Sequence, residues 1–446
     1  MKNNKVNRRR FLRNSSLGFL GAGLLGEKSF SSPVLEQDNK KPVISKYSTL
    51  GRTGFKVSNL GFGRPANPAI LKAGINAGIN YFDTAPNYGS SERDIGSIIH
   101  EFDRKKLFIT TKIHADELGS KEHILSSARK SLENLKTDYI DCFQLQGATS
   151  CEMVRHKGFH DAFAQLKHEG RVKFCGIACH GSYFPGNIED TMENILLCAI
   201  DDGRFDLLLV VYNFLSYEQG EKVLKAAKEK NIATTVMKSN PVKMYNMFKG
   251  FEEQAEANNQ EFPEHWKNTY EEFKQHNKDA QIYLETNGII SNDDDLSDVA
   301  TRFVLDNPDV NTVLVDFQNF GILESHLKYA SESLTPASIN HLTDLRNIIT
   351  KVSCRIGCNA CESSCPHNVP VNTILRYNYY FTAKGEEKFA MHKYQDLPGG
   401  KPDACLACEG FCERACPHGV LTRPLLAMAH KNLSLDGPQI SLGFKG

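Results

Sequence analysis

Eight of the chain's 13 cysteines are concentrated in two short runs near the end of its 446 residues. Each run holds four cysteines and ends in Cys-Pro. The runs read Cys354-x3-Cys358-x2-Cys361-x3-Cys365-Pro366 and Cys405-x2-Cys408-x3-Cys412-x3-Cys416-Pro417. Three of the four cysteines recur at a constant offset of 51 residues, which indicates a duplicated unit. Secreted disulfide frameworks spread their cysteines over a small domain, so this clustering predicts metal binding instead.

Four cysteines on a short loop followed by proline are typical of iron–sulfur ligation. The bacterial pattern is C-x2-C-x2-C-x3-C-P, and each run here carries one extra residue. Eight cysteines match two 4Fe-4S clusters. In the usual crossed arrangement, the first three cysteines of each run share a cluster with the last cysteine of the other run. Structural zinc is the alternative, but zinc sites favour separated C-x2-C pairs.

Other cysteines and histidines are predicted to have minor roles. His367 and His418 follow the two prolines, and we expect them to hydrogen-bond near a cluster rather than to ligate it. The remaining cysteines are interpreted as packed free thiols, because Cys175 and Cys179 lie about 13 Å apart on a strand and do not make a metal site. The same interpretation covers Cys142, Cys151 and Cys198.

The composition limits the classes of partner. Lys+Arg and Asp+Glu both number 53, so the net charge is zero, which argues against a broad nucleic-acid surface or a polybasic membrane patch. Forty per cent of residues are hydrophobic, so a sizeable core can form. No segment approaches the roughly 20 apolar residues of a membrane-spanning helix, so no transmembrane anchor is predicted in the mature chain.

Residues 1–32 have the layout of an export signal. A basic start is followed by a short apolar run from Leu17 to Leu25. The segment Asn7-Arg8-Arg9-Arg10-Phe11-Leu12-Arg13 resembles the twin-arginine export motif, with Asn7 in place of the usual Ser or Thr. We therefore expect the twin-arginine machinery as a partner and a periplasmic location. An unstructured basic tail on a cytoplasmic protein is the alternative.

From Ile44 onward, apolar runs alternate with helix-like segments, as in an α/β protein with parallel strands. Strands are predicted over 57–61, 81–83, 107–112, 139–145, 172–178, 207–212, 232–238 and 312–315, and helices over 121–135, 159–169 and 217–230. Eight such strands over about 290 residues predict a (β/α)8 TIM barrel. A doubly wound sheet is the alternative, but no G-x-G-x-x-G follows the first strand. Residues 240–293, with the only tryptophan, Trp266, are expected to form a helical insertion at the catalytic end.

Three segments of this barrel resemble the aldo/keto reductases over roughly residues 44–332. They are an opening hairpin at 47–58, the sequence Asp83-Thr84-Ala85-Pro86-Asn87-Tyr88-Gly89 within 78–92, and the strand Phe108–Lys112. The resemblance implies reduction of carbonyls with a nicotinamide cofactor. It also implies that Tyr88 is the general acid, Lys112 the cation that helps it share its proton, and Asp83 the partner of Lys112.

Other positions depart from that family. Gln146 replaces the usual histidine; it can orient a carbonyl but cannot carry a proton. Tyr212 and Asn213 remain on the cofactor side, where Tyr212 is expected to stack on a nicotinamide, and His180 is a further candidate for the site. Leu209 replaces a family glutamine. Asp316 and the neighbouring Phe317 stand where a 2′-phosphate would bind, so NADP is disfavoured and NAD, or no nucleotide, is favoured.

Along nearly its whole length the chain resembles aldo/keto reductase-like proteins with a C-terminal ferredoxin module. We expect a signal at 1–32, the barrel at 44–332, and a mainly helical iron–sulfur domain at 333–446 with a helical spacer at 371–390. The predicted function is oxidoreduction of a small carbonyl or hydroxyl substrate, a sugar being one candidate. Electrons would pass through the clusters to an electron-carrier protein or a quinone-linked partner. The alternative is a non-catalytic or nucleotide-free barrel in a protein that acts in electron transfer or binding through its clusters.

Overall fold

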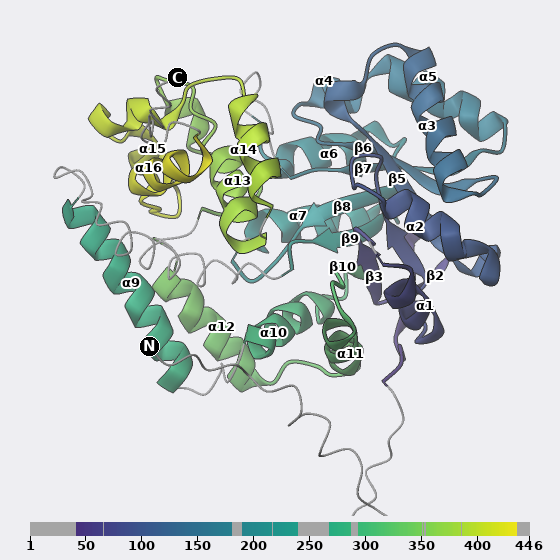
Figure 1. Cartoon of the computed structure of the whole chain (residues 1–446), viewed down its shortest axis with the longest axis horizontal. Coiled ribbons are helices and arrows are strands. Elements are labelled where there is room, and N and C mark those ends of the chain that lie inside the picture. Colours follow the sequence, from purple (N-terminus) through teal and green to yellow (C-terminus); the bar gives the residue numbers. More distant parts are fainter. Residues whose placement is uncertain are drawn as a thin grey trace, which may run out of the picture. The chain divides into compact units, whose positions relative to one another are not determined.

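The computed structural model describes residues 42–65, 67–180, 190–215, 217–239, 267–286, 293–349, 351, 354–384 and 386–434. The predicted export signal lies outside these described residues, as do Trp266 and most of the predicted insertion. From Pro42 onward, the described residues form one compact unit (Figure 1).

Eight parallel strands close into a barrel, as the alternation of the sequence predicts. They are β3 (Leu60–Gly63), β4 (Tyr81–Asp83), β5 (Phe108–His114), β6 (Ile140–Gln146), β7 (Val172–Ala178), β8 (Leu207–Val211), β9 (Ala233–Met237) and β10 (Thr312–Val315). Neighbours follow chain order, and β10 pairs with both β9 and β3 to complete the circle. The (β/α)8 prediction is confirmed, and the strand bounds agree to within two residues except at the first strand.

The first predicted strand is divided in two. Lys56–Ser58 is β2, which pairs antiparallel with β1 (Tyr47–Thr49) in a hairpin outside the barrel. The barrel strand β3 begins two residues later. Asn80 stabilises this break, because its Oδ1 accepts hydrogen bonds from the backbone N–H (2.8 Å) and the hydroxyl (3.0 Å) of Ser58.

Helices surround the barrel and bury their apolar faces against it (Figure 1). They are α1 (Pro68–Asn76), α2 (Ser91–Ile98), α3 (Lys121–Leu135), α4 (Cys151–Val154), α5 (Lys157–His168), α6 (Met192–Asp202), α7 (Tyr217–Glu229), α10 (Asp293–Leu305) and α11 (Phe320–Tyr329). Side-chain caps fix several starts; for example, Ser120 accepts from His123 N–H before α3.

Two further helices pack together beside the barrel. These are α9 (Lys267–Thr286) and α12 (Pro336–Ile349), which share a small hydrophobic core with Phe214 and Leu215. The hydroxyl of Tyr283 lies 3.0 Å from both His341 Nδ1 and Asp344 Oδ2. Although α12 falls within the range 333–446, its described contacts are therefore with the barrel side of the molecule.

The cysteine-rich segment has its own hydrophobic core. It contains α13 (Val371–Lys384), α14 (Glu387–Gln395), the short α15 (Phe411–Ala415) and α16 (Thr422–Leu433), so the predicted spacer consists of two helices. Helix α13 packs against both α14 and α16. We call residues 354–434 the cysteine module from here on.

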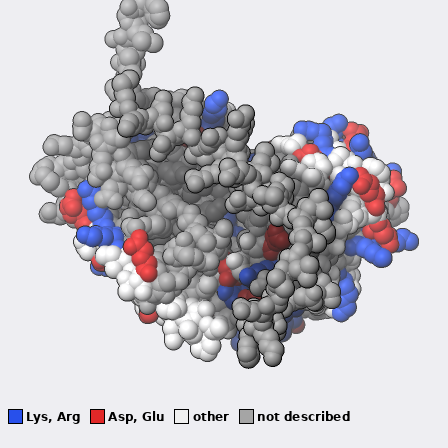
Figure 2. Space-filling view, turned by 60° about the horizontal axis from the view of Figure 1, so that its bottom comes forward, with Lys and Arg blue, Asp and Glu red and all other residues white. Residues whose placement is uncertain are grey.

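The described surface is mixed in charge. On the face in Figure 2, Lys and Arg side chains lie beside Asp and Glu in the same areas, in keeping with the zero net charge. Among the helices that the structure describes, none is both long and apolar enough to cross a bilayer.

Candidate functional site

A buried ion pair lies at the carboxyl end of the barrel. Lys112 on β5 donates to Asp83 Oδ2 at 2.6 Å and to the backbone oxygen of Thr84 at 2.8 Å. Thr110 donates to the other carboxylate oxygen of Asp83 at 2.8 Å. The Lys112 side chain is completely buried. Asp83 is the last residue of β4, and its register partner on β5 is Thr110, so the strand pairing itself sets this geometry.

Burial lowers the pKa of Lys112, and the neighbouring Asp83 opposes that shift. A buried ammonium is stable only when its charge is compensated, and here the compensation is one carboxylate at hydrogen-bond distance. The Lys112 ammonium can therefore stay charged close to the cavity although its side chain is shielded from water.

Tyr88 lies above this pair, in the turn that follows β4. Its ring centroid is 5.0 Å from Lys112 Nζ. Gln146, the last residue of β6, donates its Nε2 to the Tyr88 hydroxyl at 3.5 Å. The structure thus brings together the four residues that the sequence singled out, Asp83, Tyr88, Lys112 and Gln146.

A cavity of about 530 Å³ opens over these residues. Part of its wall comes from the barrel, including Tyr88, Gln146, His180, Leu209 and Asp316. Another part comes from the cysteine module, from Tyr379, Tyr380, Glu386, Phe389 and Lys393. The contribution of the module was not predicted, because the sequence gives no register between residues so far apart.

Two basic residues that no sequence motif singles out line the same cavity. Arg64 follows β3, and its side chain forms an ion pair with Glu386 of the module. Lys238 follows β9 and donates to the hydroxyl of Tyr380 at 3.3 Å. Both have positive φ angles, 67° and 59°, which non-glycine residues seldom adopt and which often occur at functional sites. The sequence shows no signal for this conformation.

His180 lies at the end of β7, is buried, and lines the cavity. Burial and the nearby cations Arg376 and Lys238 hold the pKa of its imidazole well below the usual value. The ring is therefore neutral at neutral pH and is available as a hydrogen-bonding group rather than as a cation.

Tyr212 and Asn213 lie outside the described lining of the cavity. The Tyr212 ring stacks on Phe303 at 5.6 Å, and its hydroxyl donates to Glu221 at 3.3 Å. Asn213 is buried and donates to the backbone oxygen of Lys238 at 2.9 Å. The expectation that Tyr212 stacks on a nicotinamide is therefore not supported by its placement, because the side chain points toward the surrounding helices.

The turn after β10 is closed by its own side chains. Asn319 Oδ1 accepts from Ile322 N–H at 2.9 Å and so caps the start of α11. Phe317 is buried with its ring edge-on to Phe62 at 5.4 Å, and Asp316 reaches the cavity. An acid and a capped helix start are a poor environment for a phosphate group.

All eight cysteines of the two runs are free thiols in this structure. Several sulfurs accept hydrogen bonds, as cluster ligands commonly do. Val369 N–H donates to Cys365 at 3.4 Å, and Val420 N–H donates to Cys416 at the same distance. Gly410 N–H lies 3.5 Å from Cys408.

Electrostatic effects between the thiols link each run to the last cysteine of the other run. The pKa of the Cys354 thiol is raised by burial and then by Cys358 and Cys416, whereas that of Cys405 is raised to about 12 by burial and then by Cys412, Cys365 and Cys408. Cys361 in turn lies near Cys354 and Cys416, and also near Cys412. We define the first group as Cys354, Cys358, Cys361 and Cys416, and the second group as Cys365, Cys405, Cys408 and Cys412.

Each group holds three cysteines of one run and the last cysteine of the other. This arrangement and the sulfur hydrogen bonds fit a 4Fe-4S cluster in each group. In the described part of the chain, no three His, Cys, Asp or Glu side chains converge as they would around a single metal ion. His418 Nε2 lies 3.8 Å from Cys358 Sγ, close to the first group.

The internal repeat extends to the carboxylates beside the cysteines. Glu362 accepts from Asn372 N–H at 2.7 Å, and Glu413, 51 residues later, accepts from Arg423 N–H at 2.9 Å. The two halves differ in charge, because Arg423 also pairs with Glu413 through its side chain at 2.6 Å. Burial raises the pKa of Glu362 to about 8, so this half holds a more weakly ionised carboxyl.

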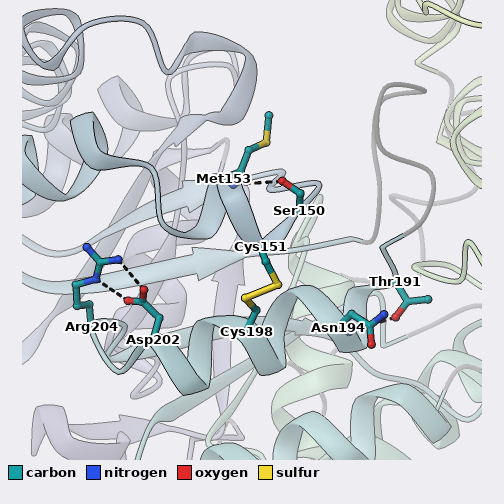
Figure 3. Close-up of a disulfide and its surroundings, with 8 residues drawn as sticks. All are labelled: Ser150, Cys151, Met153, Thr191, Asn194, Cys198, Asp202 and Arg204. Atoms are coloured by element: carbon teal, nitrogen blue, oxygen red, sulfur yellow. Dashed lines mark hydrogen bonds and ion pairs between the residues drawn. A yellow bond between two sulfur atoms is a disulfide. The ribbon is translucent and has the colours of Figure 1, made fainter.

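A disulfide joins α4 to α6, between Cys151 and Cys198 (Figure 3). The interpretation of these two residues as free thiols was wrong. Ser150 and Thr191 cap the two helices, whose packing brings the cysteine Cα atoms to 5.8 Å, within the range of a disulfide. Cys142, Cys175 and Cys179 are buried free thiols, as predicted.

Comparison with known proteins gives the class of this fold and site. The family model described as Aldo/keto reductase family matches residues 50–347. The chain therefore belongs to the Aldo/keto reductase family.

Among curated relatives, L-galactose dehydrogenase of Arabidopsis thaliana is 24% identical over 311 residues, which cover 64% of this chain and 87% of that protein. The uncharacterized oxidoreductase YqkF of Bacillus subtilis is 31% identical over 169 residues, 35% of this chain and 54% of YqkF. The chain thus spans about half the length of YqkF. A solved structure, aldo-keto reductase AKR11C1 from Bacillus halodurans, is 21% identical with a TM-score of 0.49 and covers 67% of this chain and 96% of that one.

Proposed function

We propose that the protein is an oxidoreductase that interconverts a hydroxyl and a carbonyl group on a small substrate, with electrons passing through two 4Fe-4S clusters. The observation that carries the proposal is the shared cavity. Tyr88 and Gln146 of the barrel and Tyr379, Tyr380 and Phe389 of the cysteine module line the same space.

The barrel residues supply the proton chemistry. The Tyr88 hydroxyl is positioned to give a proton to a carbonyl oxygen or to accept one from a hydroxyl. The Lys112 ammonium, 5.0 Å from the Tyr88 ring, favours the phenolate that forms when the proton leaves. Gln146 holds the Tyr88 hydroxyl and can also donate to the substrate oxygen, so it orients the reacting group without titrating.

The cysteine module supplies the electron chemistry in this proposal. The first and second groups would each hold one 4Fe-4S cluster, which exchanges single electrons when bound. Leu209, Asp316 and the capped start of α11 offer little to a nicotinamide dinucleotide, and NADP least of all. The proposal therefore assigns electron transfer to the clusters and no fixed role to a nucleotide.

A sugar is the substrate class that we propose. Both aromatic rings and polar side chains line the cavity, which suits the apolar faces and hydroxyl edges of a sugar. Two relatives have sugar names, L-galactose dehydrogenase and the D-galacturonate reductase of Fragaria ananassa, the latter 45% identical over 85 residues, 18% of this chain and 26% of that protein.

We also propose export by the twin-arginine route to the periplasm, where an electron carrier or quinone-linked partner would exchange electrons with the clusters. The Cys151–Cys198 disulfide supports this, because such bonds persist mainly in oxidising compartments. A reporter fused to residues 1–40 tests it: Arg8→Lys with Arg9→Lys is expected to retain the reporter in the cytoplasm. Retention of the reporter in the cytoplasm with both the unchanged and the substituted segment would contradict export.

The second candidate function is electron transfer or binding through the clusters alone, with a barrel that does not catalyse a reaction. Gln146 favours it, because this position carries no proton donor of the usual kind. A turnover assay on anaerobically purified holo-protein that contains iron and sulfide distinguishes the two candidates. We expect turnover of an aldose panel with an artificial acceptor, and a loss of at least about 100-fold in Tyr88→Phe. Reducible clusters without turnover would favour the second candidate.

The small molecules released by denaturing the same holo-protein are then identified by mass spectrometry. We expect no stoichiometric nucleotide. A stoichiometric NAD(P) would overturn the nucleotide-free part of the proposal and leave the proton chemistry in place.

A further inference from the structure

We infer that Arg64, held by Glu386 of the cysteine module, is a positioning residue that acts with Lys112 to set the ionisation of Tyr88. The ion pair between Arg64 and Glu386 gives the module a part in the acid–base chemistry of the barrel. The inference rests on the proposed function, in which the Tyr88 hydroxyl exchanges a proton with the substrate oxygen.

Two cations lie near the ring of Tyr88. Lys112 Nζ is 5.0 Å from the ring centroid, and the Cζ atom of Arg64 is 5.9 Å from it. A positive charge at such a distance favours the phenolate over the neutral phenol, so the proton is released more easily. The proton chemistry proposed for Tyr88 therefore depends on Arg64 as well as on Lys112.

The backbone of Arg64 is fixed at the end of β3. Its N–H donates to the backbone oxygen of Asp83 at 3.0 Å, and the preceding residue, Gly63, is paired in register with Asp83. The φ angle of Arg64 is 67°, in a region that costs free energy for residues other than glycine, so the surrounding contacts must maintain it. Asp83 also accepts from Lys112 through its side chain, so the same strand end positions both cations.

The side chain of Arg64 is fixed by the module. It forms an ion pair with Glu386, whose backbone N–H donates to the backbone oxygen of Tyr380 in α13 at 3.1 Å. Glu386 directly precedes α14, and the Phe389 ring of α14 lies 6.0 Å from the ring of Tyr380. The Glu386 carboxylate is thus held where α13 and α14 line the cavity.

The opposite charges of this ion pair lead to opposite expectations. Arg64 brings positive charge to Tyr88, and Glu386 offsets part of it, because a carboxylate favours the neutral phenol. Removal of the Arg64 charge should therefore raise the pKa of Tyr88, whereas removal of the Glu386 charge should lower it. A general disturbance of the packing has no reason to shift the two variants in opposite directions.

Other titratable groups face the same cavity, from the ends of β5, β7, β9 and β10 and from α11 and α14. They are His114, His180, Lys238, Asp316, His326 and Lys393. Asp83, which also lines the cavity, is paired with Lys112. These groups are unchanged in the variants that test the inference, so their effects on Tyr88 cancel when each variant is compared with the wild type.

The test is a pH titration of Tyr88 in the full-length holo-protein. Tyrosine enriched at Cζ in the NMR-active carbon isotope is incorporated, and the signal of Tyr88 is identified by its loss in Tyr88→Phe. We expect Arg64→Met to raise the titration midpoint by about one pH unit, and Arg64→Lys, which keeps the charge, to restore most of the shift. Glu386→Gln is expected to lower the midpoint. An unchanged midpoint in Arg64→Met, or a raised midpoint in Glu386→Gln, would overturn the inference.

Arg52→Met is the matched control. Arg52 forms an ion pair with Asp206 at 2.7 Å, and Asp206 directly precedes β8, at the end of the barrel opposite the cavity. The Tyr88 midpoint of this variant should equal that of the wild type. A shift as large as that in Arg64→Met would show a general disturbance of the fold and would overturn the inference.

The pH profile of turnover gives a second readout. With the aldose panel and the artificial acceptor, the pH of half-maximal turnover is expected to rise in Arg64→Met and to fall in Glu386→Gln, whereas a merely structural role would lower turnover equally at every pH. If the wild type turns over no aldose, the proposed function fails, and the NMR titration still decides whether Arg64 and Glu386 act on Tyr88.

Discussion

The barrel site and the cysteine module assemble their chemistry in opposite ways. At the barrel mouth, Asp83, Lys112 and Gln146 come from three neighbouring strands, whose parallel pairing brings them to the same end of the barrel. In the module, each proposed cluster would take three ligands from one short run of cysteines and only the fourth from the other run. The barrel site therefore depends on the whole fold, whereas each cysteine group depends on one loop and one crossing.

We expect the largest effect on stability and turnover when the Lys112 ion pair is broken, because this pair depends on the whole fold. Lys112→Met leaves Asp83 as a buried carboxylate without its cation, which is expected to destabilise the protein by about 3–5 kcal/mol. It also removes the charge beside Tyr88, so turnover should fall at least about 1,000-fold. Urea denaturation and steady-state kinetics measure the two effects.

The matched control is Lys130→Met, because Lys130 pairs with Glu133 on the surface with both side chains more than two-thirds exposed. A loss below about 1 kcal/mol is expected there. Similar losses in Lys112→Met and Lys130→Met would contradict the account of the buried pair.

Loss of the Cys151–Cys198 disulfide, which belongs to the barrel, is expected to have the next largest effect on stability. It closes a loop with a sequence separation of 47 residues. Its loss in Cys151→Ser with Cys198→Ser is expected to lower the free energy of unfolding by about 2–4 kcal/mol. Denaturation with and without dithiothreitol checks this: the reductant should destabilise the wild type and leave the double variant unchanged.

His180 gives a pH dependence. Its pKa is lowered in the folded protein, so the unfolded chain binds the proton more readily below the ordinary histidine value of about 6.5. Its contribution to stability is therefore present above about pH 6.5 and is lost as the pH falls further, with a slope of up to about 1.4 kcal/mol per pH unit.

The prediction is checked by denaturation at about pH 7.5 and about pH 5.5, on either side of that pKa. The wild type should lose about 1 kcal/mol more than His180→Gln between the two. An equal loss in both proteins would show that His180 titrates normally.

Removal of the ion pair between the barrel and the cysteine module is expected to have the smallest effect on stability. Arg64→Ala removes the ion pair with Glu386, whose partners are 46% and 27% exposed in their side chains. Such a pair contributes at most about 1 kcal/mol, so the melting temperature should change little. Limited proteolysis of the module should nevertheless become faster. An unchanged proteolysis rate would show that this pair does not hold the module on the barrel.

The parts that the sequence could predict are those governed by short-range patterns. The strands at 81–83, 172–178 and 312–315 coincide with β4, β7 and β10, because buried parallel strands are short apolar runs between helices. Asp83, Tyr88 and Lys112 were found because they lie in segments that resemble a known family, and Gln146 because it stands where that family has a histidine. The crossed pairing of the eight cysteines stays a prediction.

What the sequence could not predict depends on tertiary contacts. The Cys151–Cys198 bond required the packing of α4 on α6, and the spacing of the two cysteines carries no sign of it. Tyr212 was placed on the cofactor side from its neighbours in the chain, but the direction of its side chain is set by Phe303 and Glu221. The module's share of the cavity, with Tyr379 and Tyr380, joins residues that no local pattern relates.

We propose that the barrel and the cysteine module form one redox unit. EPR spectroscopy of the clusters in anaerobic holo-protein, mixed with L-galactose and other aldoses, tests this. We expect that a sugar converts the wild-type clusters to their reduced, EPR-active form, and that Tyr88→Phe slows this at least about 100-fold while dithionite still reduces both proteins. Clusters that dithionite reduces but no sugar reduces, or equal rates in the wild type and Tyr88→Phe, would contradict it.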